Sequence, residues 1–77
     1  MDHSTSKELM RRITHSPGKM AGRPTIRGLR FPVADVLELL ASGMSTEHIL
    51  IQHPLLERED ITAALFYAAL VMKGKDY

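Results

Sequence analysis

The chain has 77 residues, of which 44% are hydrophobic and 25% are charged, and its formal net charge is +1. This composition is typical of one small globular domain and argues against wholesale disorder. The lack of cysteine excludes disulfides and thiolate metal sites, and no apolar run reaches the ~18 residues of a membrane span. We therefore expect a small soluble, cytoplasmic protein with no membrane contact.

Positive charge is concentrated in the first part of the chain. Residues 1–31 contain seven Lys or Arg and two acidic side chains, whereas residues 32–77 contain three Lys or Arg and seven acidic side chains. A basic segment on an acidic body is suited to contact with phosphates or with an acidic protein face. The alternative is that so small a chain is unevenly charged by chance.

The N-terminal part is expected to combine a tail with short strands. Residues 1–11 are predicted as a flexible tail, because the Ser-rich start offers little to bury. Residues 12–32 are predicted as a strand and turn segment. An edge strand is expected over Leu9–Thr14, and an extended segment over Thr25–Phe31 could pair with it or with its counterpart in another subunit.

From Pro32 onward the apolar residues follow a helical period, and residues 33–74 are predicted to form three helices. Pro32 suits the start of the first helix, and Gly43 suits its left-handed C-terminal cap. Ser45 is expected to cap a short second helix, which Pro54 ends. The fold class is therefore mainly α, a helix-turn-helix-like bundle with short N-terminal β-strands, and residues 12–74 are one domain.

The third helix is expected to run from about residue 58 to 73, with a C-terminal tail over 75–77. It is apolar on nearly every side between Ile61 and Met72, and two short neighbouring helices cannot cover it. The N-terminal strands could cover the remainder. A homodimer is the preferred explanation, and its predicted interface contains Phe66, Tyr67 and Leu70.

Arginines in the glycine- and proline-rich segment are the candidate contact residues. Arg23, Arg27 and Arg30 are predicted to bind a partner protein or nucleic acid, supported by Lys19 and Arg12. Arginine pairs with phosphates, carboxylates or guanine edges through two parallel hydrogen bonds. Two structural alternatives stay open: a solvated strand face, or arginines bonded to the C-terminal carboxylates of the same chain.

Other residue patterns argue against catalysis and metal binding. The start of the third helix, Glu57–Asp60, is acidic, as the helix dipole favours, and it would repel the phosphates that a recognition helix approaches. His48 and His53 are five residues apart and do not share one helix face. No nucleophile–base pair or phosphate loop is present. We expect no enzymatic activity, no metal and no cofactor.

Taken together, the motifs resemble a known family of small prokaryotic proteins. They are Arg12-Ile13-Thr14, Pro17, Gly22-Arg23-Pro24, Ile26-Arg27-Gly28, Arg30-Phe31-Pro32-Val33, Leu37, Leu40, Gly43-Met44-Ser45, Ile49-Leu50, Pro54, Leu56, Glu59-Asp60-Ile61, Ala63-Ala64-Leu65 and Tyr67-Ala68. The pattern covers about residues 12 to 70. It resembles the family called domain of unknown function 433, whose members are regarded as VapB-like antitoxins.

The resemblance implies a homeodomain-like three-helix fold, a dimer, and an antitoxin that neutralises a PIN-like ribonuclease toxin encoded nearby. The alternative function is a DNA-binding transcriptional autoregulator, which would bind operator DNA through the basic N-terminal segment. Four positions depart from the family pattern. Glycine is usual at Ala21, threonine at Leu29, an acidic residue at His48 and threonine at Glu57.

Overall fold

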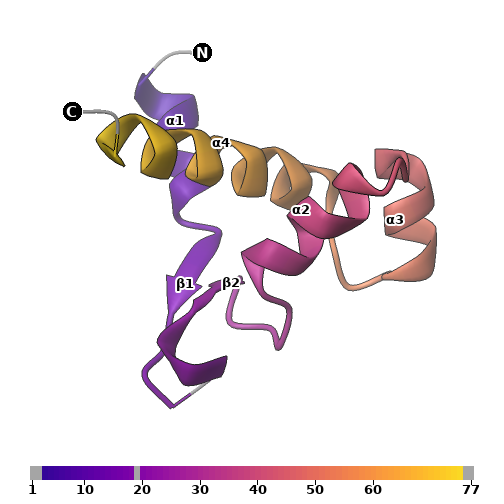
Figure 1. Ribbon diagram of the computed structural model, residues 1–77, viewed down its shortest axis with the longest axis horizontal. Coiled ribbons are helices and arrows are strands. Elements are labelled where there is room, and N and C mark those ends of the chain that lie inside the picture. The colour runs from indigo at the N-terminus through magenta and orange to yellow at the C-terminus, as the bar shows by residue number, and fades with distance from the viewer. Residues whose placement is uncertain (1–2, 19, 76–77) are drawn as a thin grey trace.

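The computed structural model describes residues 3–18 and 20–75. In these residues the elements are α1 (His3–Met10), β1 (Ile13–His15), a 3-10 turn (Met20–Gly22), β2 (Pro24–Ile26), α2 (Val33–Ala41), α3 (Thr46–Gln52) and α4 (Arg58–Lys75). Helix α4 is the longest, and α1, α2, α3 and β1 all pack against it (Figure 1). The prediction of a mainly helical fold with a small sheet is confirmed.

Helices α2 and α3 begin and end where their capping residues predict. Pro32 precedes α2, and after the helix Gly43 has a positive φ of 98°, which glycine adopts without strain. At the start of α3 the His48 amide donates to Ser45 Oγ at 3.1 Å. Helix α3 ends just before His53 and Pro54, because the residue preceding a proline avoids the helical region.

Strands β1 and β2 pair in antiparallel register, with Ile13 opposite Ile26. The predicted pairing of the two extended segments is therefore confirmed. The second segment is shorter than predicted, because the chain turns at Arg27 and Gly28, where φ is 44° and 72°. The amide of Leu29 donates to the carbonyl oxygen of Ile26 at 2.7 Å across this turn. Two consecutive positive φ angles are those of a type I′ turn.

The predicted N-terminal tail and the early start of the first strand are wrong. Residues 3–10 form α1, and Leu9 is buried, with 7% of its surface exposed. Helix α1 packs beside the C-terminal half of α4 (Figure 1). Tertiary packing thus stabilises a helix too short to form alone. Residues 1–2 of the predicted tail lie outside the described residues.

The other end of the chain also differs from expectation. Helix α4 includes Gly74 and Lys75, so the predicted C-terminal tail is wrong at residue 75, and residues 76–77 lie outside the described residues. Its first half supplies core residues and its second half extends past α2 to α1 (Figure 1).

The hydrophobic core draws on strand β2 and on α1, α2, α3 and α4. Its buried side chains include Leu9, Ile26, Val33, Val36, Ile49, Leu56, Ile61, Ala63 and Ala64.

Substituting Ala21 with glycine should stabilise the protein by up to about 1 kcal/mol. Ala21 has a φ of 57°, and a side chain in the left-handed region costs about 1–2 kcal/mol, partly offset by the greater entropy of glycine in the unfolded chain. Urea unfolding measures the difference. The control is Ala34→Gly inside α2, which should destabilise by about 1 kcal/mol. Equal losses from both substitutions would contradict the prediction.

Candidate functional site

The side chain of Asp60, in the first turn of α4, is a fully buried carboxylate held by two arginines. Arg12 Nη1 donates to Asp60 Oδ1 at 2.9 Å. Arg27 donates through Nε at 3.1 Å to both carboxylate oxygens and through Nη2 at 3.0 Å to Oδ2. Arg12 Nη1 also donates to Glu57 Oε1 at 2.8 Å. We call Arg12, Arg27, Glu57 and Asp60 the ion cluster.

Helix geometry places Asp60 at the centre of this cluster. Asp60 is the third residue of α4, and its Oδ2 accepts from the Glu57 amide, just before the helix, at 2.8 Å. This contact is one half of a capping box, and the helix dipole adds to its stability. The acidic start that the sequence indicates for the third helix thus includes a residue, Asp60, that caps it. Sequence alone did not show that this carboxylate is buried and also binds arginines.

Hydrogen bonds within the ion cluster shift the pKa values of Asp60, Arg12 and Arg27. Burial on its own would raise the pKa of Asp60, but the hydrogen bonds from Arg27, the Glu57 amide and Arg12 outweigh it, and the pKa is lowered. The hydrogen bonds to Glu57 and Asp60 raise the pKa of Arg12, and the hydrogen bonds to Asp60 raise that of Arg27. The cluster therefore contains ionised groups at neutral pH.

The turn at Arg27 is also hydrogen-bonded to the loop before α4, to Arg12 and to β1. Arg27 Nη2 also donates to the carbonyl oxygen of Leu55 at 2.6 Å, and the Arg27 amide donates to the carbonyl oxygen of Arg12 at 2.7 Å. The Gly28 amide donates to Thr14 Oγ1 at 2.9 Å. For Arg12 and Arg27, the alternative of arginines bonded to carboxylates of the same chain is correct. These two side chains position the hairpin against α4.

The predicted contact residues thus fall into two groups: Arg12 and Arg27 bind carboxylates of the same chain, and Arg23 and Arg30 do not. Arg23 and Arg30 are exposed, and within residues 3–18 and 20–75 neither forms an ion pair. Lys19, which we also predicted as a contact residue, lies outside the described residues. Arg23 and Arg30 therefore remain the candidates for contact with a partner.

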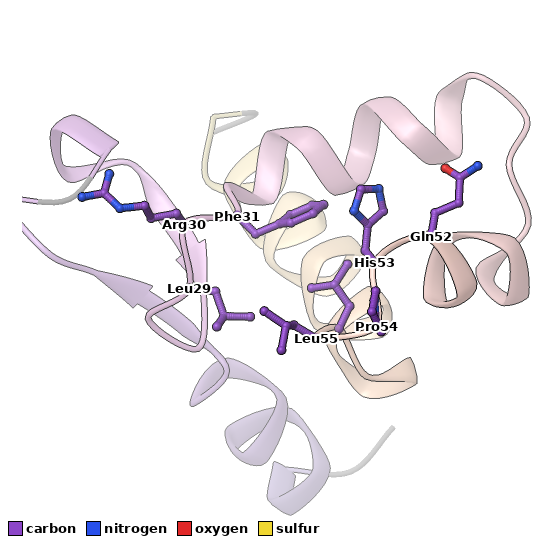
Figure 2. A pocket seen from close by; sticks show the side chains of 8 residues that line it. Leu29, Arg30, Phe31, Gln52, His53, Pro54 and Leu55 are labelled. Carbon is purple, nitrogen blue, oxygen red and sulfur yellow. The ribbon is translucent and has the colours of Figure 1, made fainter.

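A groove lies between the segment after the Arg27 turn and the loop that follows α3 (Figure 2). Its volume is about 370 Å³, and it is lined by Leu29, Arg30, Phe31, Gln52, His53, Pro54, Leu55 and Leu56. The rings of Phe31 and His53 meet edge to face, with centroids 5.0 Å apart. In Figure 2 Leu29 and Phe31 point towards the loop, whereas the Arg30 side chain points away from the groove.

Sequence reasoning did not identify this groove. One wall comes from Leu29 and Phe31, which lie in and just after the turn that ends the predicted extended segment. Its other wall comes from His53 and Leu55, in a loop whose path depends on how α3 and α4 pack. Leu55 is 73% exposed, and nothing in its local sequence indicates that it faces Leu29.

The predicted dimer residues on α4 differ in their surroundings. Phe66 and Tyr67 are half-buried, and Tyr67 packs against the core with its hydroxyl 3.3 Å from His15 Nε2. Leu70 is 44% exposed and continues into exposed Val71 and Met72. A hollow of about 280 Å³ beside them is lined almost entirely by apolar side chains of α2, α4 and Pro24. The C-terminal half of α4 therefore presents an apolar face.

The described residues contain neither a metal-binding cluster nor a membrane-spanning helix. Within residues 3–18 and 20–75, no three His, Asp or Glu side chains are grouped so that they could hold a metal ion. In the same part of the chain, every helix is too short or too polar to cross a membrane. The buried carboxylate of Asp60 accepts hydrogen bonds from Arg12, Arg27 and the Glu57 amide of the same chain.

Comparisons with known proteins identify relatives of this chain. The uncharacterized protein y4eO of Sinorhizobium fredii (strain NBRC 101917 / NGR234) is 43% identical over 56 residues, which are 73% of this chain and 25% of that protein. The chain thus spans about a quarter of the length of this relative. A DUF433 member protein from Anabaena variabilis ATCC 29413, solved by crystallography, superposes with a TM-score of 0.76 at 27% identity. That match covers 95% of this chain and 72% of the other.

Residues 13–68 match the family described as protein of unknown function (DUF433), and they include both strands, helices α2 and α3, and the ion cluster apart from Arg12. The resemblance noted in the sequence is therefore confirmed. The chain belongs to the DUF433 family.

Proposed function

We propose that this protein is a non-catalytic, antitoxin-like binding protein that, as a homodimer, holds a PIN-like ribonuclease toxin inactive. The observation that supports the proposal best is the division of the arginines. Asp60 binds Arg12 and Arg27, whereas Arg23 and Arg30 are exposed and have no ion-pair partner in the described part of the chain. Two guanidinium groups are therefore available to a partner.

The active site of a metal-dependent ribonuclease is a cluster of carboxylates, which is chemically suited to arginine. A guanidinium inserted there would form two parallel hydrogen bonds to a carboxylate and would occupy the place of metal and RNA. Arg30 is the better placed of the two, because it lies on a segment fixed by the turn at Arg27 and by α2. Fixed backbone on both sides lowers the entropy lost on binding.

Growth rescue tests this proposal. The protein should restore growth to cells that express the PIN-like toxin encoded beside its gene, and Arg23→Ala/Arg30→Ala together should abolish the rescue. The control is Arg11→Ala, which removes another exposed cation and should leave rescue unchanged. Circular dichroism of each variant verifies folding. Full rescue by the doubly substituted protein would overturn the role of these arginines.

The apolar face of α4 supports the homodimer part of the proposal. Leu70→Glu should convert a dimer into a monomer in sedimentation velocity, because it would bury a charge among Leu65, Val71 and Met72 of the two chains. The control is Thr62→Glu, at an exposed position in the first half of the same helix, which should remain dimeric. The wild-type protein is measured at about 100 μM, a concentration at which even a weak dimer is populated. If it sediments as a monomer there, the prediction is wrong.

The second candidate function is a DNA-binding autoregulator, for which we propose that α2, α3 and α4 act as a homeodomain-like unit. In that arrangement α4 would be the recognition helix, yet Glu57 just before it and Glu59 in its first turn are both acidic and exposed. DNA contact would instead use Arg23 and Arg30. A gel-shift assay with the upstream DNA tests this candidate. Retardation that weakens steeply between 50 and 200 mM salt would favour it, because proteins that bind DNA mainly through phosphates lose about 10³-fold in affinity over this range. Absence of retardation at low salt would exclude it.

A further inference from the structure

We propose that the groove in Figure 2, together with the acidic start of α2, docks a partner segment that combines aliphatic side chains with Lys or Arg. Under the proposed function, on which this assignment of the partner rests, that segment belongs to the RNA-binding surface of the toxin. Such a surface must hold phosphates with cations. The carboxylates of α2 would occupy those cations in place of RNA.

The side chains that form the walls of the groove are mainly apolar, and the groove is open to solvent. Leu29 and Phe31 form one wall, and His53 and Leu55 form the other (Figure 2). Leu55, at 73% exposure, is among the most exposed large apolar side chains of the described residues. Its backbone is nevertheless fixed, because its carbonyl oxygen accepts from Arg27 Nη2. An exposed leucine on an anchored backbone is a preorganised contact for an aliphatic side chain.

The rim of the groove is acidic. A second hollow, of about 260 Å³, shares Phe31 and His53 with the first and is completed by Asp35, Glu38 and Leu39 of α2. Asp35 and Glu38 are three residues apart, so they lie on one face of the helix. Both are exposed, and neither forms an ion pair with any described residue.

The cations near the groove do not neutralise this rim. The Arg30 side chain points away from the groove in Figure 2, and Arg27 is bound to Asp60. Two free carboxylates beside an apolar floor therefore favour a partner segment of opposite charge. Arg30 faces another direction and stays available for the carboxylates of the same nuclease.

A peptide titration followed by NMR tests the groove directly. The full-length, 15N-labelled protein is titrated at low salt with three 12-residue peptides that alternate Leu with Lys, Glu or Gln. We expect the Lys peptide to bind most tightly, with shifts at Phe31, His53 and Leu55, and the Glu peptide not to bind. Asp35→Asn/Glu38→Gln should weaken the Lys peptide at least fivefold, and Leu55→Ala should weaken the Lys and Gln peptides alike.

Glu8→Gln, an exposed acidic position on α1, is the matched control and should leave binding unchanged. Equal affinity for the Lys and Glu peptides, or shifts confined to the end of α4, would overturn the proposal. Its failure is separable from that of the proposed function. If rescue depends on Arg23 and Arg30 but the peptides do not bind, the docking role of the groove is wrong and the proposed function stands. If the Lys peptide binds but the protein does not rescue growth, the groove binds such segments and the assignment of the toxin as partner is wrong.

Discussion

Replacing Asp60 with asparagine should lower the free energy of unfolding by about 3 kcal/mol. The substitution keeps the shape of the side chain but leaves Arg12 and Arg27, which are both partly buried, without their shared negative charge. Removing one partner of a buried ion pair costs about 3–5 kcal/mol, and the low end applies because both guanidinium groups can still reach water. The NH2 group of Asn also cannot accept hydrogen bonds, so at least one of the oxygens that accept from Arg27 is lost.

Urea unfolding at pH 7 measures this loss. Glu59→Gln removes the exposed carboxylate next to Asp60 and should change stability by no more than about 0.5 kcal/mol. A similar small change for Asp60→Asn would show that the ion cluster adds little to the fold.

Acid titration of stability separates the charge of Asp60 from its shape. The pKa of Asp60 is lower in the folded than in the unfolded protein, so its ionised form stabilises the fold. That contribution is complete above the unfolded pKa of about 4 and is lost as the pH falls through the folded value. Wild-type stability should therefore decline below about pH 4 more steeply than that of Asp60→Asn. Parallel curves for the two proteins would contradict this linkage.

Arg27→Ala should have the second-largest effect, a loss of about 2–3 kcal/mol. It removes the hydrogen bonds to both oxygens of Asp60 and to the carbonyl oxygen of Leu55. The buried carboxylate then keeps only the hydrogen bonds from Arg12 and from the Glu57 amide among those formed by the described residues. It also leaves an alanine at a φ of 44°, where the left-handed strain is no longer offset by the side-chain contacts.

Two companion variants define the origin of this effect. Arg27→Lys should recover only part of the loss, because an ammonium cannot reproduce the planar fork of the guanidinium. Arg30→Ala removes the exposed arginine three residues later and should change stability by less than about 0.5 kcal/mol. Equal losses from Arg27→Ala and Arg30→Ala would contradict the structural division of the arginines.

The helices of the body were predictable from local chemistry. Pro32 and Gly43 mark the start and end of α2, and Ser45 and Pro54 mark those of α3, each through its own local chemistry. Helix α1 was not predictable in this way, because it depends on burying Leu9 against α4, far along the chain. Tertiary contacts override weak local preference in such segments.

The candidate site was predictable only in part, for a related reason. The arginine-rich segment was found, but charge and spacing cannot show which arginine meets a carboxylate 33 or 48 residues away. Arg27 lies in a turn with a positive φ, and its side chain contacts Asp60. The extended segment predicted from the sequence does not indicate this turn. The groove walls at Leu29 and Leu55 are likewise brought together by the fold alone.

Asp60 completes the first turn of α4 and at the same time binds two arginines of the N-terminal segment. Nucleation of this helix is therefore coupled to contacts that span much of the chain, and such contacts form only when the hairpin docks. We expect the hairpin and the start of α4 to open together, so that so small a protein unfolds as one cooperative unit.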